Sequence, residues 1–388
     1  MIFKFPAYFF QSEKWAKFWL EASLPSHAYF KIETKRQLGS LTFVISAIVY
    51  KYPWFFGLNH LYLAKAPALS VENIQGEKVN LPENFEMEKE DILKLFKDFL
   101  EKTVELAKAE KSVFIKADFD HQVTDLFGIL DNSELVNFLK NNLGKPATLS
   151  SKVIQYLSTI TLDIELAQSK FNSELPKFIG NTPSASQTPL LSKEKLGMSL
   201  LEFFEQSSEF WKTTNSNIRR YTRKSLQIGW VCDEVKSESN FEDFWEVYSQ
   251  TSKRQKFTTY SKSYTKLLYD KNFSHIILLR DESGVAQSCW IGIESENTLT
   301  YLYGGNTEKG LEKYGQYLIH LVAVRLCVFK KLRFYDLGGY DSKHGYGKFK
   351  EGFHGEVRNF LGPVDILLQP FVYNVVSGFV LIGKMLRR

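Results

Sequence analysis

One order of predicted elements occurs twice in this chain, and it limits the chain to few architectures. In the first half, β-branched and aromatic residues predict strands at Leu41–Tyr50 and His60–Ala64. Apolar residues then recur at helical spacing over Asp91–Ala109, and Ser112–Ala117 predicts a further strand. Strands followed by one long helix and a returning strand form a compact unit around a single sheet.

The second half of the chain follows the same order. Asp281-Glu282-Ser283-Gly284 is a hairpin turn signal, and it separates two predicted strands. This layout is that of an N-acyltransferase (GNAT-like) core, so we predict an α/β chain with two tandem GNAT-like domains and mostly antiparallel mixed sheets flanked by helices. The predicted elements are strands at Ser274–Arg280, Ala286–Glu294, Thr298–Tyr303 and Leu332–Leu337, and a helix at Tyr314–Phe329.

The length of the chain agrees with two domains. Its 388 residues exceed what one hydrophobic core usually organises. Tyr156–Glu165 predicts a strand between the halves, and Ala167–Met198 is rich in Ser, Pro, Lys and Thr. We therefore expect an insertion loop at residues 167–198.

Composition narrows the class of protein. Hydrophobic residues make up 44% and charged residues 24%, and no apolar run is long enough to span a membrane. The start of the chain lacks a signal-peptide pattern, so we expect a cytoplasmic protein. The net charge of +5 favours anionic partners such as nucleotides, tRNA or acidic lipids, although solubility alone also explains it. Cys232, Cys289 and Cys327 are far apart, so no disulfide framework or metal site is predicted.

Glycine pairs and aromatic residues mark a candidate site between Tyr301 and Phe353. The segments are Tyr-Leu-Tyr-Gly-Gly, Tyr-Asp-Leu-Gly-Gly and Phe-Lys-Glu-Gly-Phe. Glycine pairs weaken strands, and their placement beside tyrosines, an acid and a lysine favours a polar crevice. Strand alternation predicts that Tyr301 and Tyr303 share one face, either as half-buried sheet residues or as hydroxyls directed into a cleft.

Lys350 and the basic segment Trp211–Lys224 each have a structural and a functional interpretation. Lys350 follows a polar stretch at Asp341–Lys348, so we expect it on a turn or short strand, as a solvated lysine or as a cation that stabilises an oxyanion or phosphate. Trp211–Lys224 holds five basic residues after a predicted helix. It is either a solvated helix face or a phosphate-binding surface.

Several common catalytic motifs are missing from the sequence. The place where acetyl-CoA-dependent GNAT enzymes carry a glycine-rich pyrophosphate loop contains Lys309–Gln316, which lacks that pattern. There is no Gly-x-Ser-x-Gly, His-Glu-x-x-His or P-loop sequence. We therefore expect no cofactor, and in particular no acetyl-CoA.

Together these segments resemble the FemABX family of peptidoglycan aminoacyltransferases. The resemblance includes the glycine and aromatic motifs, Phe349-Lys350, the N-terminal Gln11-Ser12 with Trp15, the strand from Leu61 to Pro67, and Asn217-Ile218-Arg219. It implies a first domain at residues 1–157 completed by residues 362–388, and a second domain at residues 158–361 that contains the insertion.

The resemblance also implies a reaction. Family members transfer an amino acid from aminoacyl-tRNA to an amine of the stem peptide of a muramyl precursor, which is UDP-linked or lipid-linked. The implied partners are thus aminoacyl-tRNA and that precursor, with no DNA. Two alternatives stay open: an N-acyltransferase of the same fold that acts on another amino sugar, peptide or polysaccharide, and a non-catalytic relative that binds a precursor or tRNA.

Residue by residue, the resemblance assigns Lys350 to the oxyanion or leaving oxygen, beside Phe349. Asp118 ends a domain 1 strand where the family has an acid, and Tyr301 lines the cleft. Tyr260 stands where some relatives have an arginine that contacts phosphate. The implied catalytic residues are Lys350, Phe349, Tyr301 and Asp118, and the implied substrate-binding residues are Lys17, Thr258, Tyr260, Tyr264, Tyr303 and Arg219.

The C-terminal stretch Phe371–Arg388 is mostly apolar and ends in basic residues. A helix that docks on the core is one interpretation. The other is a basic, apolar helix that rests on anionic lipid and gives the protein a peripheral contact at the inner face of the membrane.

Overall fold

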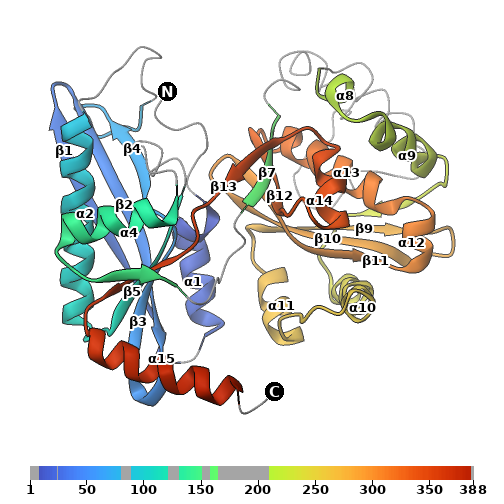
Figure 1. Cartoon of the computed structure of the whole chain (residues 1–388). Helices are drawn as coiled ribbons and strands as arrows, with labels where there is room; N and C mark the ends of the chain where they lie inside the picture. Colours follow the sequence, from blue (N-terminus) through green and yellow to red (C-terminus); the bar gives the residue numbers. More distant parts are fainter. Residues whose placement is uncertain are drawn as a thin grey trace. The chain divides into compact units, whose positions relative to one another are not determined.

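A computed structural model describes residues 8–23, 25–79, 89–120, 131–150, 158–164 and 209–385. The chain divides into two compact units: unit 1 comprises Met1–Leu157 and Asn359–Arg388, and unit 2 comprises Ser158–Arg358. Each unit contains one mixed, mostly antiparallel sheet with helices packed on it (Figure 1). The predicted α/β class with two GNAT-like units is confirmed, while the predicted insertion at 167–198 lies outside the described residues.

The sheet of unit 1 has the strand order β1-β2-β3-β5-β14-β6, and β4 pairs with β2. Among its described strands, β3 and β5 are the parallel pair, and they pair from Leu61 opposite Ile115 to Ala66 opposite Phe119, with a register shift between Ala64 and Ala66. β14 comes from the far end of the sequence and lies between β5 and β6. The strands are β1 Ala28–Leu38, β2 Leu41–Pro53, β3 Asn59–Ala66, β4 Ala68–Glu72, β5 Phe114–Phe119, β6 Ala147–Leu149 and β14 Val364–Leu367.

One face of this sheet is covered by the long helix α2. Its apolar stripe, which includes Leu95, Phe96 and Phe99, is buried against Val49 and Ile115 of the sheet. This burial is the reason that the helical spacing in the sequence could predict the element. The helices of unit 1 are η1 Phe9–Gln11, α1 Glu13–Glu21, η2 Phe55–Gly57, α2 Lys89–Ala109, α4 Asn132–Leu143 and α15 Pro370–Met385.

The sheet of unit 2 has the order β13-β7-β12-β11-β10-β9-β8. Its one parallel pair, β11 and β12, is in register only from Thr298 opposite Phe334 to Thr300 opposite Asp336. The parallel pairing is thus shorter than in unit 1. The strands are β7 Ser158–Asp163, β8 Val231–Asp233, β9 Ser274–Arg280, β10 Ala286–Ser295, β11 Thr298–Asn306, β12 Phe334–Gly339 and β13 Glu356–Asn359.

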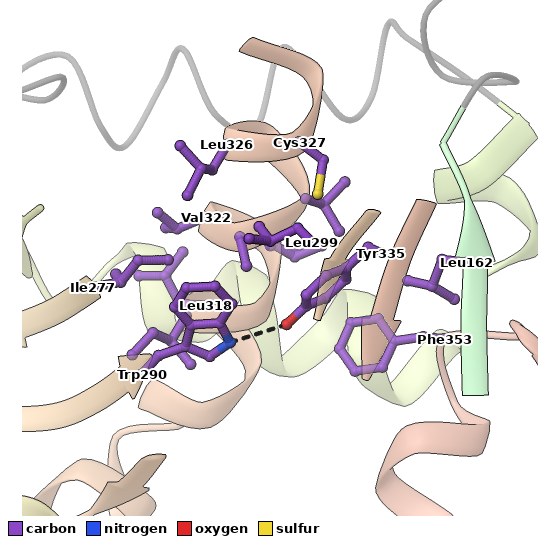
Figure 2. Packing of buried hydrophobic residues seen from close by; sticks show 14 of the residues in the cluster. Leu162, Ile277, Trp290, Leu299, Leu318, Val322, Leu326, Cys327, Tyr335 and Phe353 are labelled. Atoms are coloured by element: carbon purple, nitrogen blue, oxygen red, sulfur yellow. Dashed lines mark hydrogen bonds between the residues drawn. The ribbon is translucent and has the colours of Figure 1, made fainter. Parts of the chain in front are cut away.

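Helix α13 packs on one face of this sheet, and α10 and α11 lie on the other (Figure 1). α13 is apolar on nearly all sides, and it forms the core with Trp290, Leu299 and Tyr335 (Figure 2). A short helix precedes it, which the sequence did not predict. The helices of unit 2 are α8 Glu209–Thr213, α9 Ser216–Leu226, α10 Glu238–Gln255, α11 Lys262–Tyr269, α12 Glu308–Glu312, α13 Gly315–Phe329 and α14 Gly345–Glu351.

Within the described ranges, no helix is both long enough and apolar enough to cross a membrane.

Candidate active site

Lys350 lies on the short helix α14, which corrects the predicted turn or short strand. The backbone N–H groups of Gly347 and Lys348 both donate to the carbonyl of His344 and start the helix. The glycine-rich, polar sequence gave no helical periodicity, because α14 has only seven residues. The helix turns the Lys350 side chain inward, and only 7% of the residue is exposed.

The ammonium group of Lys350 is only partly satisfied. Its Nζ donates to the carbonyl of Gly339 at 2.7 Å and lies 5.5 Å from the ring centroids of both Tyr301 and Tyr346. An ammonium has three N–H donors, and the Gly339 carbonyl is its one hydrogen-bond acceptor among the described residues. Burial lowers the pKa of Lys350 to about 8, and the nearby Asp336 carboxylate opposes that shift. The group is therefore a charged donor near neutral pH.

Asp336 is the buried acid of this site. Its carboxylate accepts hydrogen bonds from the Thr159 hydroxyl and, at 2.7 Å, from the backbone N–H of Gly338. Burial raises the pKa of Asp336, and the Thr159 bond and the charges of Arg358 and Lys350 lower it. These contacts hold the end of β12 in place and put negative charge near Lys350.

Tyr301 and Tyr303 do not share a face, which corrects the prediction from strand alternation. The register of β10 and β11 shifts at this point, where Ile291 faces Tyr303 and Gly292 faces Tyr301. Leu302 is the extra residue of a β-bulge, and a bulge reverses the faces of the residues on either side of it.

The ring contacts of the two tyrosines agree with the bulge. Tyr301 stacks with Trp290 and meets His320 of α13 edge-on, with centroids 5.0 Å apart. Tyr303 instead packs against Tyr248 of α10 and against Tyr260. Of the two predicted phenols, Tyr301 therefore belongs to the Lys350 site, and burial raises its pKa so that it stays a hydroxyl donor.

His320 is a member of the site that sequence reasoning missed. Trp290 Nε1 donates to the Tyr335 hydroxyl at 3.1 Å, and a further hydrogen bond of 2.6 Å joins that hydroxyl to His320 Nδ1. Figure 2 shows the first of these bonds. Burial and the charge of Lys350 lower the pKa of His320 to about 3, so the imidazole is neutral. The one available signal was a histidine inside the otherwise apolar α13 pattern.

Phe349 forms an aromatic wall next to Lys350. Its ring lies 5.2 Å from that of Tyr317, 5.4 Å from Phe353 and 5.5 Å from His320. The predicted pairing of Phe349 with Lys350 thus corresponds to one short helix that supplies both the cation and its apolar surroundings.

Three predicted substrate-binding residues lie together on the other face of the sheet. Tyr260 stacks on Tyr264 with centroids 4.5 Å apart and contacts Tyr303 at 5.9 Å. Tyr260 is half exposed, and Thr258 is exposed in the loop before α11. This tyrosine cluster, formed by Tyr260, Tyr264 and Tyr303, is partly exposed to solvent. Its substrate role stays a prediction.

Arg219 and Lys17 have structural partners. Arg219 donates to the carbonyls of Trp211 and Lys212 at 3.2 and 2.8 Å, so its guanidinium caps the end of α8. Lys17 lies exposed on α1 and pairs with Glu13 at 2.8 Å. Neither arrangement tests the predicted contact with a phosphate.

The predicted catalytic Asp118 is fully buried in unit 1. Its carboxylate pairs with Lys65 Nζ at 3.1 Å, and both side chains are inaccessible to solvent. Burial raises the pKa of Asp118 to about 6, while the Lys65 charge opposes that shift. Within unit 1 this geometry is that of a structural ion pair, and a catalytic role stays a prediction.

The remaining cations of the Trp211–Lys224 segment lie mainly on α9. This helix carries four basic residues and no acidic one. Tyr221 stacks on Tyr314 at 4.7 Å, and the guanidinium of Arg220 lies 4.6 Å from the Tyr221 ring. The α9 surface, defined by Arg220, Tyr221, Lys224 and Tyr314, thus combines cations with a stacking platform.

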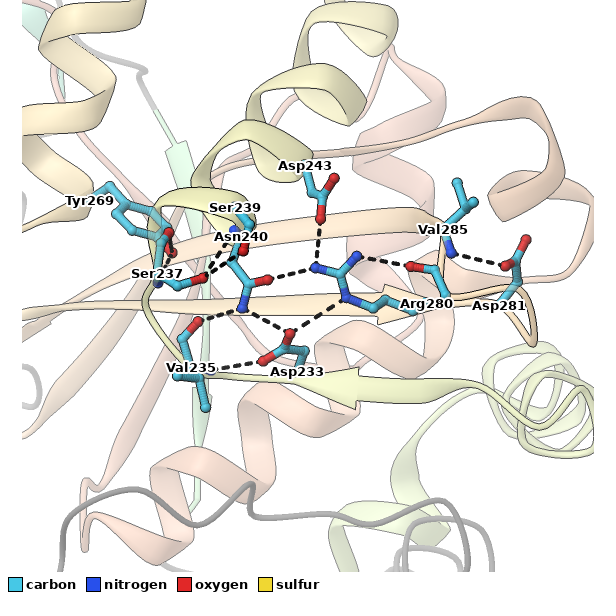
Figure 3. Close-up of polar contacts among 11 residues, drawn as sticks. Asp233, Val235, Ser237, Ser239, Asn240, Asp243, Tyr269, Arg280, Asp281 and Val285 are labelled. Carbon is cyan, nitrogen blue, oxygen red and sulfur yellow. Dashed lines mark hydrogen bonds and ion pairs between the residues drawn. The ribbon is translucent and has the colours of Figure 1, made fainter.

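A cleft of about 730 Å³ between α10 and the start of α12 lies away from Lys350. Its wall includes Asp243, which belongs to an ion-pair network around Arg280 (Figure 3). Arg280 also bonds Asn240 at 2.6 Å, and Asn240 bonds Asp233 at 2.8 Å. The network fastens β8, β9 and α10 together, so we interpret it as structural. In the described part of the chain, no cluster of His, Cys, Asp or Glu forms a metal site.

The geometry of unit 2 and the repeated fold define a tandem GNAT-like protein. A crystal structure of FemX matches at 15% identity with a TM-score of 0.64, covering 95% of this chain and 94% of that one. The structure of L-PGS from Bacillus licheniformis (10% identity, 89% and 88% covered, TM-score 0.45) and a tandem GNAT protein from the clavulanic acid biosynthesis pathway (8%, 90% and 86%, 0.42) also match. Of these, the FemX match supports the fold.

Residues 277–379 match the model of the FemAB family. That segment contains Tyr301, His320, Asp336 and Lys350. Over this segment the chain is similar to the FemAB family, which confirms the resemblance predicted from the sequence motifs. No curated protein sequence matches the chain.

Proposed function

We propose that this protein is an aminoacyltransferase that moves an amino acid from aminoacyl-tRNA to an amine of the stem peptide of a peptidoglycan precursor. The match of residues 277–379 to the FemAB family supports the class of reaction. The observation that carries the proposal is Lys350 of α14, a buried, charged lysine that bonds Gly339 at the end of β12 and has unused N–H donors.

The chemistry requires no covalent enzyme intermediate. The acceptor amine attacks the carbonyl carbon of the aminoacyl ester and forms a tetrahedral oxyanion. The bond from that carbon to the ribose oxygen then breaks, while the new amide bond remains. Lys350 donates its unused N–H groups to the oxyanion or to the leaving oxygen, where negative charge develops. The ester is already activated, so acetyl-CoA is not part of the proposal.

The proton of the attacking amine needs an acceptor. The pKa of His320 is about 3, which makes it a weak base at neutral pH, and the raised pKa of Tyr301 keeps that phenol protonated. We therefore propose that the proton moves from the amine to the leaving ribose oxygen, with Tyr301 as a donor that orients the reacting groups. His320, held by Tyr335, keeps the aromatic wall around Lys350 in place.

Two surfaces of unit 2 fit the substrates. The tyrosine cluster offers hydroxyls and stacking faces to the nucleotide or sugar of a UDP-linked or lipid-linked muramyl peptide. The α9 surface offers cations and a stacking platform to the single-stranded acceptor end of tRNA. Both substrates would be met in the cytoplasm, where we propose that the protein acts.

A direct test is to incubate the full chain with a complete set of charged tRNAs and with either the UDP-linked or the lipid-linked muramyl pentapeptide. Mass spectrometry should detect an acceptor whose mass has risen by one amino acid. If neither acceptor gains mass while acyl-CoA donors do support acylation, the chain is an N-acyltransferase of another kind. Binding of both substrates with no transfer would identify a non-catalytic relative.

A further inference from the structure

The helix α15 has two different faces. On the inner face, Tyr373 and Val376 are buried against unit 1. The Tyr373 hydroxyl donates to Asp365 at 2.6 Å, and Asp365 pairs with Lys116 at 2.7 Å. This buried polar chain fixes the helix on the sheet and therefore fixes which residues face outward.

The outer face of α15 is apolar. Phe371, Val375 and Phe379 are 80%, 41% and 62% exposed. Their spacing of four residues places them in one stripe along the helix. A solvated helix face of a globular protein is normally polar, so the stripe is unusual.

A second exposed apolar group lies at the same end of unit 1. Phe56, in the turn between β2 and β3, is 82% exposed, and Phe55 is 49% exposed. Phe56 adopts a left-handed backbone conformation with φ of 57°, which is rare for a bulky residue. Trp54 joins this turn to α15, because its ring stacks with that of Tyr373 at 6.0 Å and contacts Phe114 at 5.0 Å. Figure 1 shows α15 beside this end of β2 and β3.

Two exposed lysines lie at the same end of unit 1. Lys108 and Lys111, at the end of α2, are exposed. This end of α2 lies against the start of β3, since Asn59 Nδ2 donates to the carbonyl of Glu110 at 3.0 Å. The Glu110 carboxylate is neutralised by Lys51 at 2.8 Å.

We propose that this end of unit 1 binds the surface of an anionic lipid bilayer. The lipid-facing surface consists of Phe55, Phe56, Phe371, Val375 and Phe379, with Lys108 and Lys111 at its edge. The phenylalanines enter the boundary between headgroups and acyl chains, and the lysines contact lipid phosphates. Single exposed apolar residues are common, but five on adjacent elements with a cationic edge are typical of interfacial binding. The proposal does not depend on the transferase activity.

The test is sedimentation of the full chain with vesicles. Phosphatidylcholine vesicles with about a third of phosphatidylglycerol should pellet the wild-type protein, and pure phosphatidylcholine should pellet less. Phe56→Ser and Phe371→Ser should each lower the partition coefficient by about tenfold, because each removes an aromatic ring that the proposal buries in the bilayer. Both positions are highly exposed, so folding should be unaffected, as circular dichroism can verify. Ile74→Ser is the matched control, since Ile74 is 75% exposed in unit 1 outside this surface.

Two outcomes would overturn the proposal. The first is equal pelleting of the wild type, both phenylalanine variants and the Ile74 variant. The second is a wild-type dimer in sedimentation velocity that Phe56→Ser and Phe371→Ser convert to a monomer with no loss of vesicle binding, which would assign the surface to a second copy of the chain. These point substitutions are cleaner than truncation after Pro370, which would uncover the core residues under Tyr373.

Discussion

Unit 1 and unit 2 each hold a buried lysine near a buried aspartate at the end of their parallel strands. In unit 1, Lys65 of β3 pairs directly with Asp118 of β5, and its Nζ lies 3.8 Å from the centre of the Phe360 ring. In unit 2, Lys350 comes from the added helix α14 and bonds the carbonyl of Gly339 instead of the acid. The ammonium group of Lys65 is paired with a carboxylate, whereas the ammonium group of Lys350 keeps N–H donors that a ligand can use.

The difference between the strand pairs explains this contrast. β3 and β5 stay paired up to Ala66 and Phe119, with a register shift between Ala64 and Ala66 that falls at Lys65, and Lys65 Nζ reaches the acid on β5. The parallel pairing of β11 and β12 ends at Thr300 and Asp336, after three residue pairs. The same fold therefore supports a structural ion pair where its parallel strands stay paired, and a candidate active site where they do not.

The largest effect that the comparison predicts is on Lys350. Lys350→Met should lower the rate of amino acid transfer about a thousandfold, because it removes the donor to the developing negative charge. Single-turnover kinetics with charged tRNA measure the effect. Lys348→Met is the matched control, since Lys348 is an exposed lysine on the same helix and should keep normal rates. A fully active Lys350→Met protein would remove the distinction between the two lysines.

The next effect concerns the ion pair of unit 1. Asp118→Asn should lower the free energy of unfolding by about 3 kcal/mol, because Lys65 would remain buried without its counter-charge. Urea unfolding measures the change, and Lys65→Met combined with Asp118→Asn should recover part of it. Loss of transfer with unchanged stability would instead support the catalytic role that the family resemblance implies for Asp118.

A third prediction concerns pH. The pKa of Lys350 falls from its ordinary value of 10.5 to about 8 on folding, so the unfolded chain binds this proton more tightly. The wild type should therefore gain stability relative to Lys350→Met as pH rises from 8 towards 10.5, by about 2 kcal/mol at pH 10. Unfolding curves of both proteins across this range isolate the contribution of Lys350. If the stabilities of the wild type and of Lys350→Met change with pH in the same way, Lys350 is solvated in the folded protein.

The smallest predicted effect concerns the strand that carries Tyr301. In Gly304→Ala, the new Cβ would lie 2.5 Å from the carbonyl oxygen of Cys289 and 3.0 Å from the Tyr301 hydroxyl, so the backbone must shift. We expect a loss of about 1 to 2 kcal/mol in stability together with slower transfer. Gly345→Ala, which meets no atom within 4 Å at the start of α14, should leave stability almost unchanged. Thermal unfolding separates the two.

Sequence patterns were sufficient for the fold, because α2 buries apolar residues at regular spacing and α13 is a continuous apolar run. They were insufficient for the site. The β-bulge at Leu302 places Tyr301 and Tyr303 on opposite faces, and a single extra residue leaves no trace in an alternating pattern. Lys350 was found through its motif, but its helix is too short to show a period.

His320 shows a second reason why the sequence did not predict the whole candidate site. A histidine in an apolar helix is usually a core residue, and its position beside Lys350 follows only from how α13 packs on β12. The exposure of Phe56 is likewise invisible in the sequence, because aromatic residues beside a strand usually predict burial.

The position of β14 has a consequence for how the chain is made. β14 pairs with β5 on one side and β6 on the other, yet it is synthesised after all of unit 2. A ribosome that has released residues 1–157 has not yet supplied the strand between β5 and β6. Unit 2, which is continuous in sequence, can complete its sheet first, and we expect the nascent unit 1 to depend on chaperones until residue 367 emerges.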